Sequence, residues 1–286
     1  MPLDEKGYNL KEPEILKTEI KIGAEKPFRV LHMSDTHLAL ANENDDERKH
    51  ELAKERPFGY PEETMTLASE YSKREGLVIL HTGDLIDFVS DANLKRAGAF
   101  IRENDVFFVA GNHEYSQYVG ETFEDEAYRN QSLPLVQSYF TNDIRFAKRE
   151  ISGVNFVALD NSYYKIDRAQ LDALRTVVGE GKPVVLMMHV PLYSESFYDL
   201  MRSRSQKYPV YLMSAPHEKI AYYCEKEYGQ QVSDEVTDEA YEYIKSESAI
   251  KCLLVGHMHF CHEDRLTDRL TQYVTGFKIV REITFS

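Results

Sequence analysis

Short apolar runs alternate with charged segments through the first half of the chain. The runs at 28–34, 77–84 and 106–112 are apolar at most positions and stop at polar residues, as buried strands do. The segments between them, 61–76 and 91–104, have the residue spacing and the terminal residues of helices. This succession predicts a βαβαβ unit, with neighbouring strands covered by helices.

The two helices are marked by their ends and by an apolar face. Pro61 suits a first helical position, and Gly76 suits a stop. Leu94, Ala97 and Ile101 recur at i, i+3 and i+7, which predicts one buried face for the second helix.

The second half of the chain predicts further strands at 153–162, 183–189 and 249–260, and a helix at 167–181 with Asp167 as its N-cap and Gln170 three residues on. The tail, 268–286, alternates between apolar and polar residues and contains Gly276, which predicts an antiparallel strand pair that turns at this glycine. The length of 286 residues suits one large domain, 1–286.

Two segments depart from this rhythm. Residues 193–250 hold nine of the nineteen tyrosines and one basic stretch, 201–207, and we interpret the whole segment as a cap or insertion over the site. Residues 41–56 are highly charged, which predicts a solvated loop or an exposed helix.

Polar clusters follow five of the apolar runs. They are Asp35-Thr-His37, Gly83-Asp84, Gly111-Asn112-His113-Glu114, His189 and Gly256-His257-Met-His259. Ligands gather at the carboxyl ends of strands in open α/β sheets, so these clusters are expected to meet. In extended chain, D-x-H and H-x-H would project both side chains to the same side of the strand.

The types of residue in these clusters indicate a metal centre. Two Asp, one Asn and four His are too many ligands for one tetrahedral zinc, and they suit two adjacent ions bridged by a carboxylate. Mixed oxygen and nitrogen ligands fit Mn, Fe or Zn as divalent or trivalent ions better than calcium. Two such ions are the usual device for activating a water and clamping a phosphoryl group.

The ordered set D-x-H, G-D, G-N-H-E, H and G-H-x-H resembles the calcineurin-like metallophosphoesterase superfamily, over residues 28–260. The resemblance implies a four-layer α/β/β/α sandwich of two mixed sheets with a dinuclear metal site at the strand ends. It also implies hydrolysis of a phosphoester by attack of a metal-bridging hydroxide, without a covalent phosphoenzyme.

The family pattern assigns a role to each cluster. It implies that one metal is held by Asp35, His37, Asp84 and His259, and the other by Asp84, Asn112, His189 and His257. His113 would then contact the phosphate and protonate the leaving oxygen, Asn112 would also face the substrate, and Glu114 would orient its neighbours. His217, in the predicted cap, is a secondary candidate for substrate contact.

Departures from the pattern narrow the branch. Residues 83–89 keep Asp87 but have Phe88 and Val89 where protein Ser/Thr phosphatases carry Arg-Gly, and purple acid phosphatases have a tyrosine in place of Asp87. The pattern is similar to cyclic-nucleotide phosphodiesterases and other small-substrate phosphohydrolases. Monoester and diester substrates both stay open.

Composition limits the partners. The net charge is −14 without a long basic run, which disfavours tracking of nucleic acid. Three cysteines without a C-x-x-C motif, a polar N-terminus and the lack of a long apolar span favour a cytoplasmic protein without a membrane segment. We therefore expect a small phosphorylated substrate, a nucleotide among the candidates. The alternatives are a nuclease of the same superfamily and a non-catalytic metal-binding scaffold.

Overall fold

The computed structural model describes residues 12–119, 125–206 and 208–286. The strands are β1 Glu14–Ile20, β2 Phe28–Met33, β3 Ile79–His81, β4 Val106–Phe108, β5 Phe146–Ile151, β6 Val154–Leu159, β7 Val184–Met187, β8 Ile250–Val255, β9 His262–Arg265, β10 Thr271–Val274 and β11 Ile279–Phe285. The helices are α1 Glu47–Glu55, α2 Pro61–Glu75, α3 Asp91–Glu103, α4 Glu126–Gln137, α5 Arg168–Val178, α6 Glu195–Arg204, α7 His217–Ile220, α8 Glu225–Gln231 and α9 Glu235–Ser246, with a 3-10 turn η1 at His113–Tyr115.

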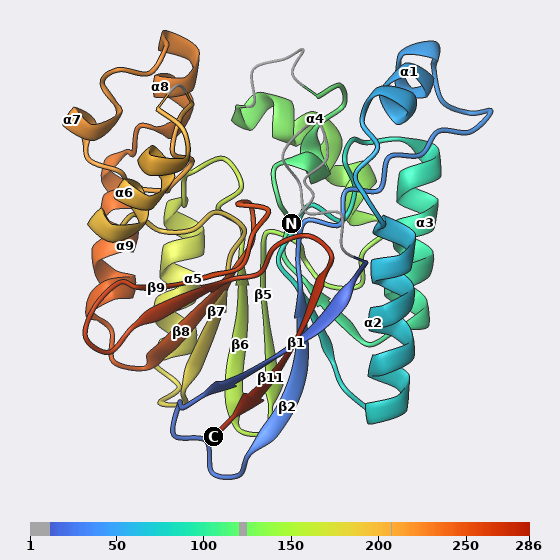
Figure 1. The fold of residues 1–286 in the computed structure, drawn as a ribbon. Coiled ribbons are helices and arrows are strands. Elements are labelled where there is room, and N and C mark those ends of the chain that lie inside the picture. Colours follow the sequence, from blue (N-terminus) through green and yellow to red (C-terminus); the bar gives the residue numbers. More distant parts are fainter. Residues whose placement is uncertain (1–11, 120–124, 207) are drawn as a thin grey trace.

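The strands form two mixed sheets. The first has the order β1-β11-β2-β3-β4, and β2, β3 and β4 run parallel. The second has the order β5-β6-β7-β8-β10-β9, and β6, β7 and β8 run parallel. Helices α2 and α3 cover the first sheet, and α5 and α9 cover the second (Figure 1).

Three separate apolar clusters show that the molecule has four layers. One lies between the two sheets and joins Val30 and Leu80 to Phe156 and Leu254. The other two lie between each sheet and its helices. This is the predicted α/β/β/α sandwich, and the fold class is confirmed.

The predicted helix signals act as expected. Gly76 ends α2 with a φ of 66°, and Asp167 and Gln170 form a complete capping box at α5. Leu94, Ala97 and Ile101 are all buried on α3.

The prediction for the tail is wrong. β10 pairs with β8 and β9 in the second sheet, whereas β11 pairs with β1 and β2 in the first. The chain crosses between the sheets near Gly276, where a Cβ would lie 2.6 Å from the Phe260 Cα. The alternation of apolar and polar residues indicates that one face of each strand is buried, but it does not indicate which sheet the strand joins.

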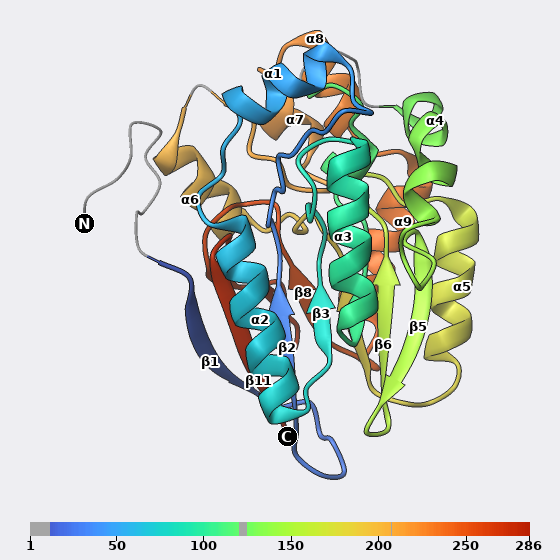
Figure 2. The same cartoon turned by 90° about the vertical axis from the view of Figure 1, so that its right-hand side faces the viewer.

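The elements at the upper edge of the sandwich come from separate parts of the chain. Helices α1, α4, α7 and α8 gather above the ends of β2, β3 and β6 (Figure 2). Residues 193–250 include α9, which belongs to the connection between β7 and β8. These two strands are parallel, so the chain must cross over between them. In the described part of the chain, no helix combines the length and the apolar character that a membrane span needs.

Candidate metal centre and active site

The polar clusters predicted from the sequence all lie after strands. Asp35 and His37 follow β2, Asp84 follows β3, Asn112 and His113 follow β4, His189 follows β7, and His257 and His259 follow β8. Because the parallel strands of both sheets end at the same edge of the sandwich, these side chains come within contact distance of one another.

The first group consists of Asp35, His37, Asp84 and His259, whose ligand atoms all lie within 4.8 Å of one another. The Nε2 atoms of His37 and His259 are 3.0 Å apart. His259 Nε2 lies 3.5 Å from Asp35 Oδ1, and His37 Nε2 lies 3.6 Å from Asp84 Oδ2. Four ligand atoms thus face a common centre.

The second group consists of Asp84, His189 and His257. His189 Nε2 lies 3.1 Å from Asp84 Oδ2 and 3.1 Å from His257 Nδ1. Asp84 belongs to both groups, so its carboxylate is placed to bridge two ions.

The backbone brings these ligands together in a way that the sequence reasoning got wrong. The sequence predicted extended chain at these positions. Asp35 and His37 instead have φ values of 55° and 53°, and His257 and His259 have φ values of 68° and 57°. The left-handed region is uncommon for residues other than glycine and is often found at functional sites. The His257 N–H donates to the Asp35 carboxylate at 2.9 Å, which links two of these turns.

Two glycines allow the backbones to approach the cluster. A Cβ on Gly111 would lie 2.2 Å from Asp84 Oδ1, and one on Gly83 would lie 2.4 Å from the Gly111 nitrogen. Gly83 also has a φ of 92°. A side chain on Gly111 would displace the bridging carboxylate, and one on Gly83 would collide with the Gly111 backbone and the His189 ring.

The hydrogen bonds around the cluster fit metal ligation. His37 Nδ1 lies 2.9 Å from Asp87 Oδ1, and His189 Nδ1 lies 2.7 Å from the Thr82 carbonyl oxygen. Each Nδ1 therefore carries a proton, and each Nε2 faces the cluster, where a metal ion can replace any proton that it holds. The buried Asn112 Oδ1 has no hydrogen-bond partner among the described residues, as expected of an oxygen that binds a metal ion.

The charges at the site favour a bound cation. Burial lowers the pKa of His189, but the Asp84 and Asp35 carboxylates outweigh burial and raise it to about 10. Burial raises the pKa of Asp35 to about 6, with a further contribution from Asp84. Burial lowers the pKa of His257 to about 3, so this ring is neutral and can offer a lone pair.

His113 lies beside the cluster and outside both groups. The backbone N–H of His113 donates to Asp84 Oδ1 at 3.0 Å, and the ring Nδ1 lies 2.6 Å from the Asp87 carbonyl oxygen. Because Nδ1 donates to that carbonyl, Nε2 is the ring nitrogen that can exchange a proton with a substrate.

Glu114 holds the loops together. It is fully buried, and its carboxylate accepts N–H groups from Asp84, Leu85, Ile86 and Gly111. The expected orienting role of Glu114 thus takes the form of four hydrogen bonds that join the loop after β3 to the loop after β4.

Sequence reasoning gave no role to three residues that support the site. Asp87 contacts His37, and Arg56 in turn donates to Asp87 through Nε and Nη2. The Tyr164 hydroxyl lies 2.9 Å from His257 Nε2. Asp87 could have been found as the acid in the G-D-x-x-D spacing, but Arg56 and Tyr164 are far from the motifs in sequence.

The role of Arg56 also changes the interpretation of 41–56. The segment contains an exposed helix, α1, as predicted, but the residue after that helix reaches inward to a buried carboxylate. The Asp87 side chain is fully buried, whereas that of Arg56 is 29% exposed.

The structure does not bring His217 to the cluster. It is exposed on α7, and its Nδ1 lies 2.8 Å from the Tyr228 hydroxyl.

A pocket of about 390 Å³ opens beside the cluster. Its lining residues include His113, Asn112 and Tyr164, together with Met201, Tyr211 and Gln230 from the 193–250 segment.

Comparison with known families agrees with this geometry. A family model described as calcineurin-like phosphoesterase matches residues 28–261. The chain belongs to this family. Its members use divalent metals in a dinuclear site, and the two Asp/His groups fit such a site. Membership supports metal-dependent hydrolysis of phosphoesters.

Solved structures show more distant likeness. A dimetal phosphatase from Danio rerio is 14% identical, with a TM-score of 0.49 and 88% of each chain covered. The phosphopantetheinyl hydrolase from Mycobacterium tuberculosis is 12% identical, with a TM-score of 0.42, 87% of this chain and 89% of that chain covered. An NAD nucleotidase from Haemophilus influenzae is 12% identical, with a TM-score of 0.41, 88% of this chain and 45% of that chain covered. Comparison with curated proteins gives no match.

Proposed function

We propose that this protein hydrolyses phosphoesters of small molecules, a nucleotide being one candidate. The observation that carries the proposal is the arrangement of two ligand groups that share Asp84, with His113 beside them at a pocket of about 390 Å³. Such an arrangement can hold two ions and a phosphoryl group together.

The proposed ligands are those that the family pattern implies. One ion would be held by Asp35, His37, Asp84 and His259, and the other by Asp84, Asn112, His189 and His257. Neutral imidazoles and carboxylates suit Mn, Fe or Zn. When bound, the two ions supply a water of lowered pKa and neutralise charge on the phosphoryl oxygens.

The chain's own residues provide the remaining chemistry. His113 is positioned to give the proton on Nε2 to the leaving oxygen. The Asp87 carbonyl oxygen accepts from Nδ1 of His113 and fixes the orientation of the ring. The Asp87 carboxylate does the same for His37, and Tyr164 fixes the His257 ring.

The predicted cap, 193–250, is assigned a role in substrate choice. Three of its residues, Met201, Tyr211 and Gln230, line the pocket at the cluster. A pocket covered in this way would admit a small ester more readily than a polymer, and the net charge of −14 also disfavours the nuclease alternative. The cytoplasmic location stays a prediction.

The first experiment is a paired hydrolysis assay. Protein stripped of metal and reloaded with Mn²⁺ is given p-nitrophenyl phosphate and bis-p-nitrophenyl phosphate, with a chelator control. We expect chelator-sensitive turnover, and the preferred ester separates a monoesterase from a diesterase. Absence of turnover for both esters and for a panel of nucleotides, with two metals bound per chain, would favour the non-catalytic scaffold instead.

The role of His113 is tested by substitution. His113→Ala is expected to lower kcat by about 10²- to 10⁴-fold, as loss of a general acid does, while two metals per chain are retained. His50→Ala, on the outlying helix α1, is the matched control and should leave kcat unchanged. A His113→Ala enzyme with wild-type kcat would show that this residue is not the acid.

A further inference from the structure

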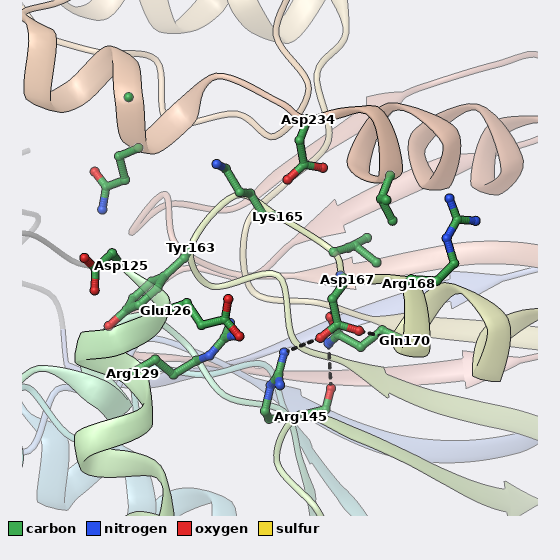
Figure 3. Close-up of a pocket in the computed structure, with 14 residues that line it drawn as sticks. Asp125, Glu126, Arg129, Arg145, Tyr163, Lys165, Asp167, Arg168, Gln170 and Asp234 are labelled. Carbon is green, nitrogen blue, oxygen red and sulfur yellow. Dashed lines mark hydrogen bonds and ion pairs between the residues drawn. The ribbon is translucent and has the colours of Figure 1, made fainter.

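A second pocket adjoins the one at the metal cluster. It has a volume of about 380 Å³ and lies between α4, the start of α5 and the segment from α8 to α9 (Figure 3). Gln230 lines both pockets, and the consecutive residues Tyr163 and Tyr164 each line one of them. A molecule bound at the cluster could therefore extend toward this second pocket.

Four basic side chains line the second pocket in a protein whose net charge is −14. Three of them form ion pairs: Arg145 with Asp167 at 2.8 Å, Arg168 with Glu239 at 2.6 Å, and Arg129 more loosely with Glu126 at 3.8 Å. Lys165, which has no ion pair among the described residues, and Arg129, whose pair is the longest of the three, are the cations most available to a ligand.

Arg129 is held in the wall with only a long ion pair, to Glu126. Its side chain is 10% exposed, and its Nε has no hydrogen-bond partner among the described residues. The nearest acidic contact joins Arg129 Nη2 to Glu126 Oε1 at 3.8 Å, too long for a hydrogen bond. A buried guanidinium with an unused N–H is costly unless a ligand supplies the acceptor.

Lys165 is exposed at the pocket and forms no hydrogen bond or ion pair within the described ranges. Its ammonium group can move to meet an anion, whereas Arg129 is fixed by packing. The two cations thus offer one rigid donor and one mobile donor to the same space.

The acidic side chains of the pocket are largely occupied by helix ends. Asp125, Asp167 and Asp234 are the N-caps of α4, α5 and α9, and each accepts a backbone N–H of its own helix at 2.8 or 2.9 Å. Three helix N-termini therefore meet at this pocket, and their partial positive charges offset the three carboxylates. The fourth acidic side chain, Glu126, is exposed and lies 3.8 Å from Arg129, so the four basic side chains and the three helix N-termini together outweigh the four carboxylates, which favours an anion.

We infer that this pocket binds an anionic oxygen group, a phosphate or a carboxylate, of a small molecule. Arg129 and Lys165 are the principal donors. The group belongs either to a separate small anion or to a substrate that carries a second anionic group; the latter case rests on the proposed phosphoesterase activity.

The first test measures binding without turnover. Sulfate is titrated calorimetrically into the metal-loaded wild-type protein, Lys165→Ala and the control Lys73→Ala, which removes an exposed lysine on α2. We expect Lys165→Ala to weaken sulfate binding by about 3- to 10-fold, the range for the net contribution of one hydrogen bond, and Lys73→Ala to leave it unchanged. Identical binding by all three proteins, or no binding by the wild type, would overturn the inference.

The second test separates the two sources of the anion. Alkanediol bisphosphates of increasing length, from propanediol to hexanediol, are compared with the matching alkyl monophosphates by phosphate release. A lower KM for one bisphosphate length that Lys165→Ala abolishes would assign the pocket to the substrate. Sulfate binding that depends on Lys165, without a bisphosphate preference, would assign it to a separate anion.

The outcomes also distinguish this inference from the proposed function. Monophosphate hydrolysis with no effect of Lys165→Ala on sulfate or bisphosphates would refute the anion pocket and leave the phosphoesterase activity standing. Sulfate binding that depends on Lys165 in a protein that hydrolyses no ester would support the anion pocket and refute the phosphoesterase activity.

Discussion

Replacement of Glu114 by glutamine tests whether its carboxylate holds the catalytic loops together. Oε2 accepts the N–H groups of Asp84 and Gly111, and Oε1 accepts those of Leu85 and Ile86. An amide has one oxygen, so Glu114→Gln would leave two buried N–H groups facing an NH₂ donor.

The magnitude follows from those two lost acceptors. A buried donor without a partner costs about 1–3 kcal/mol, so the variant should be destabilised by about 2–6 kcal/mol. At about 2 °C per kcal/mol for a chain of this size, the thermal midpoint should fall by about 4–12 °C. The loop that carries Asp84 would also lose its anchor, so metal affinity should fall with stability.

The protonation state of Glu114 makes the test decisive. Burial and the Asp84 carboxylate raise the pKa of Glu114, while backbone N–H groups oppose this shift. A protonated carboxyl would have no acceptor for its O–H, because all four neighbours are donors; we therefore expect the ionised form. A protonated Glu114 would resemble glutamine, and the substitution would then have little effect.

The assay is thermal unfolding followed by circular dichroism, since the chain has no tryptophan. Wild type, Glu114→Gln and Glu70→Gln are compared with and without added Mn²⁺. Glu70 is exposed on α2, and its substitution should change stability by less than about 0.5 kcal/mol. A Glu114→Gln midpoint within about 1 °C of the control would refute the ionised, four-bond role.

Three further outcomes are expected. Asp87→Asn removes the charged partner of His37 and should weaken metal binding by about 10- to 100-fold in a metal-competition titration. Unchanged metal affinity would contradict the role of Asp87 in orienting His37. Tyr164→Phe removes one hydrogen bond to His257 and should weaken metal binding by a smaller factor, while circular dichroism shows a folded protein. A loss of metal affinity as large as that of Asp87→Asn would not fit this geometry. Burial raises the pKa of the Cys252 thiol, so a thiol reagent should modify two of the three cysteines in the native protein and all three after denaturation; rapid native modification of Cys252 would contradict its burial.

The sequence alone predicted the fold class and the members of the candidate site. Apolar runs that end in ligand-type residues identify both a strand and the edge at which it stops, because strand burial and ligand placement are local properties of the chain. Helix ends were equally readable, as the capping box of Asp167 and Gln170 shows. The family resemblance added the four-layer arrangement of the two sheets and the assignment of the ligands to two metal ions.

Only the tertiary structure decided the features that depend on contacts between distant segments. The split of β10 and β11 between two sheets, the contact of Arg56 with Asp87 and that of Tyr164 with His257 leave no periodic signal in the sequence. The left-handed conformations of five ligands could not be predicted from the sequence either, because Asp and His tolerate many conformations and tertiary hydrogen bonds select one. The sequence thus specified the site's chemical groups, and the packing of two sheets specified their geometry.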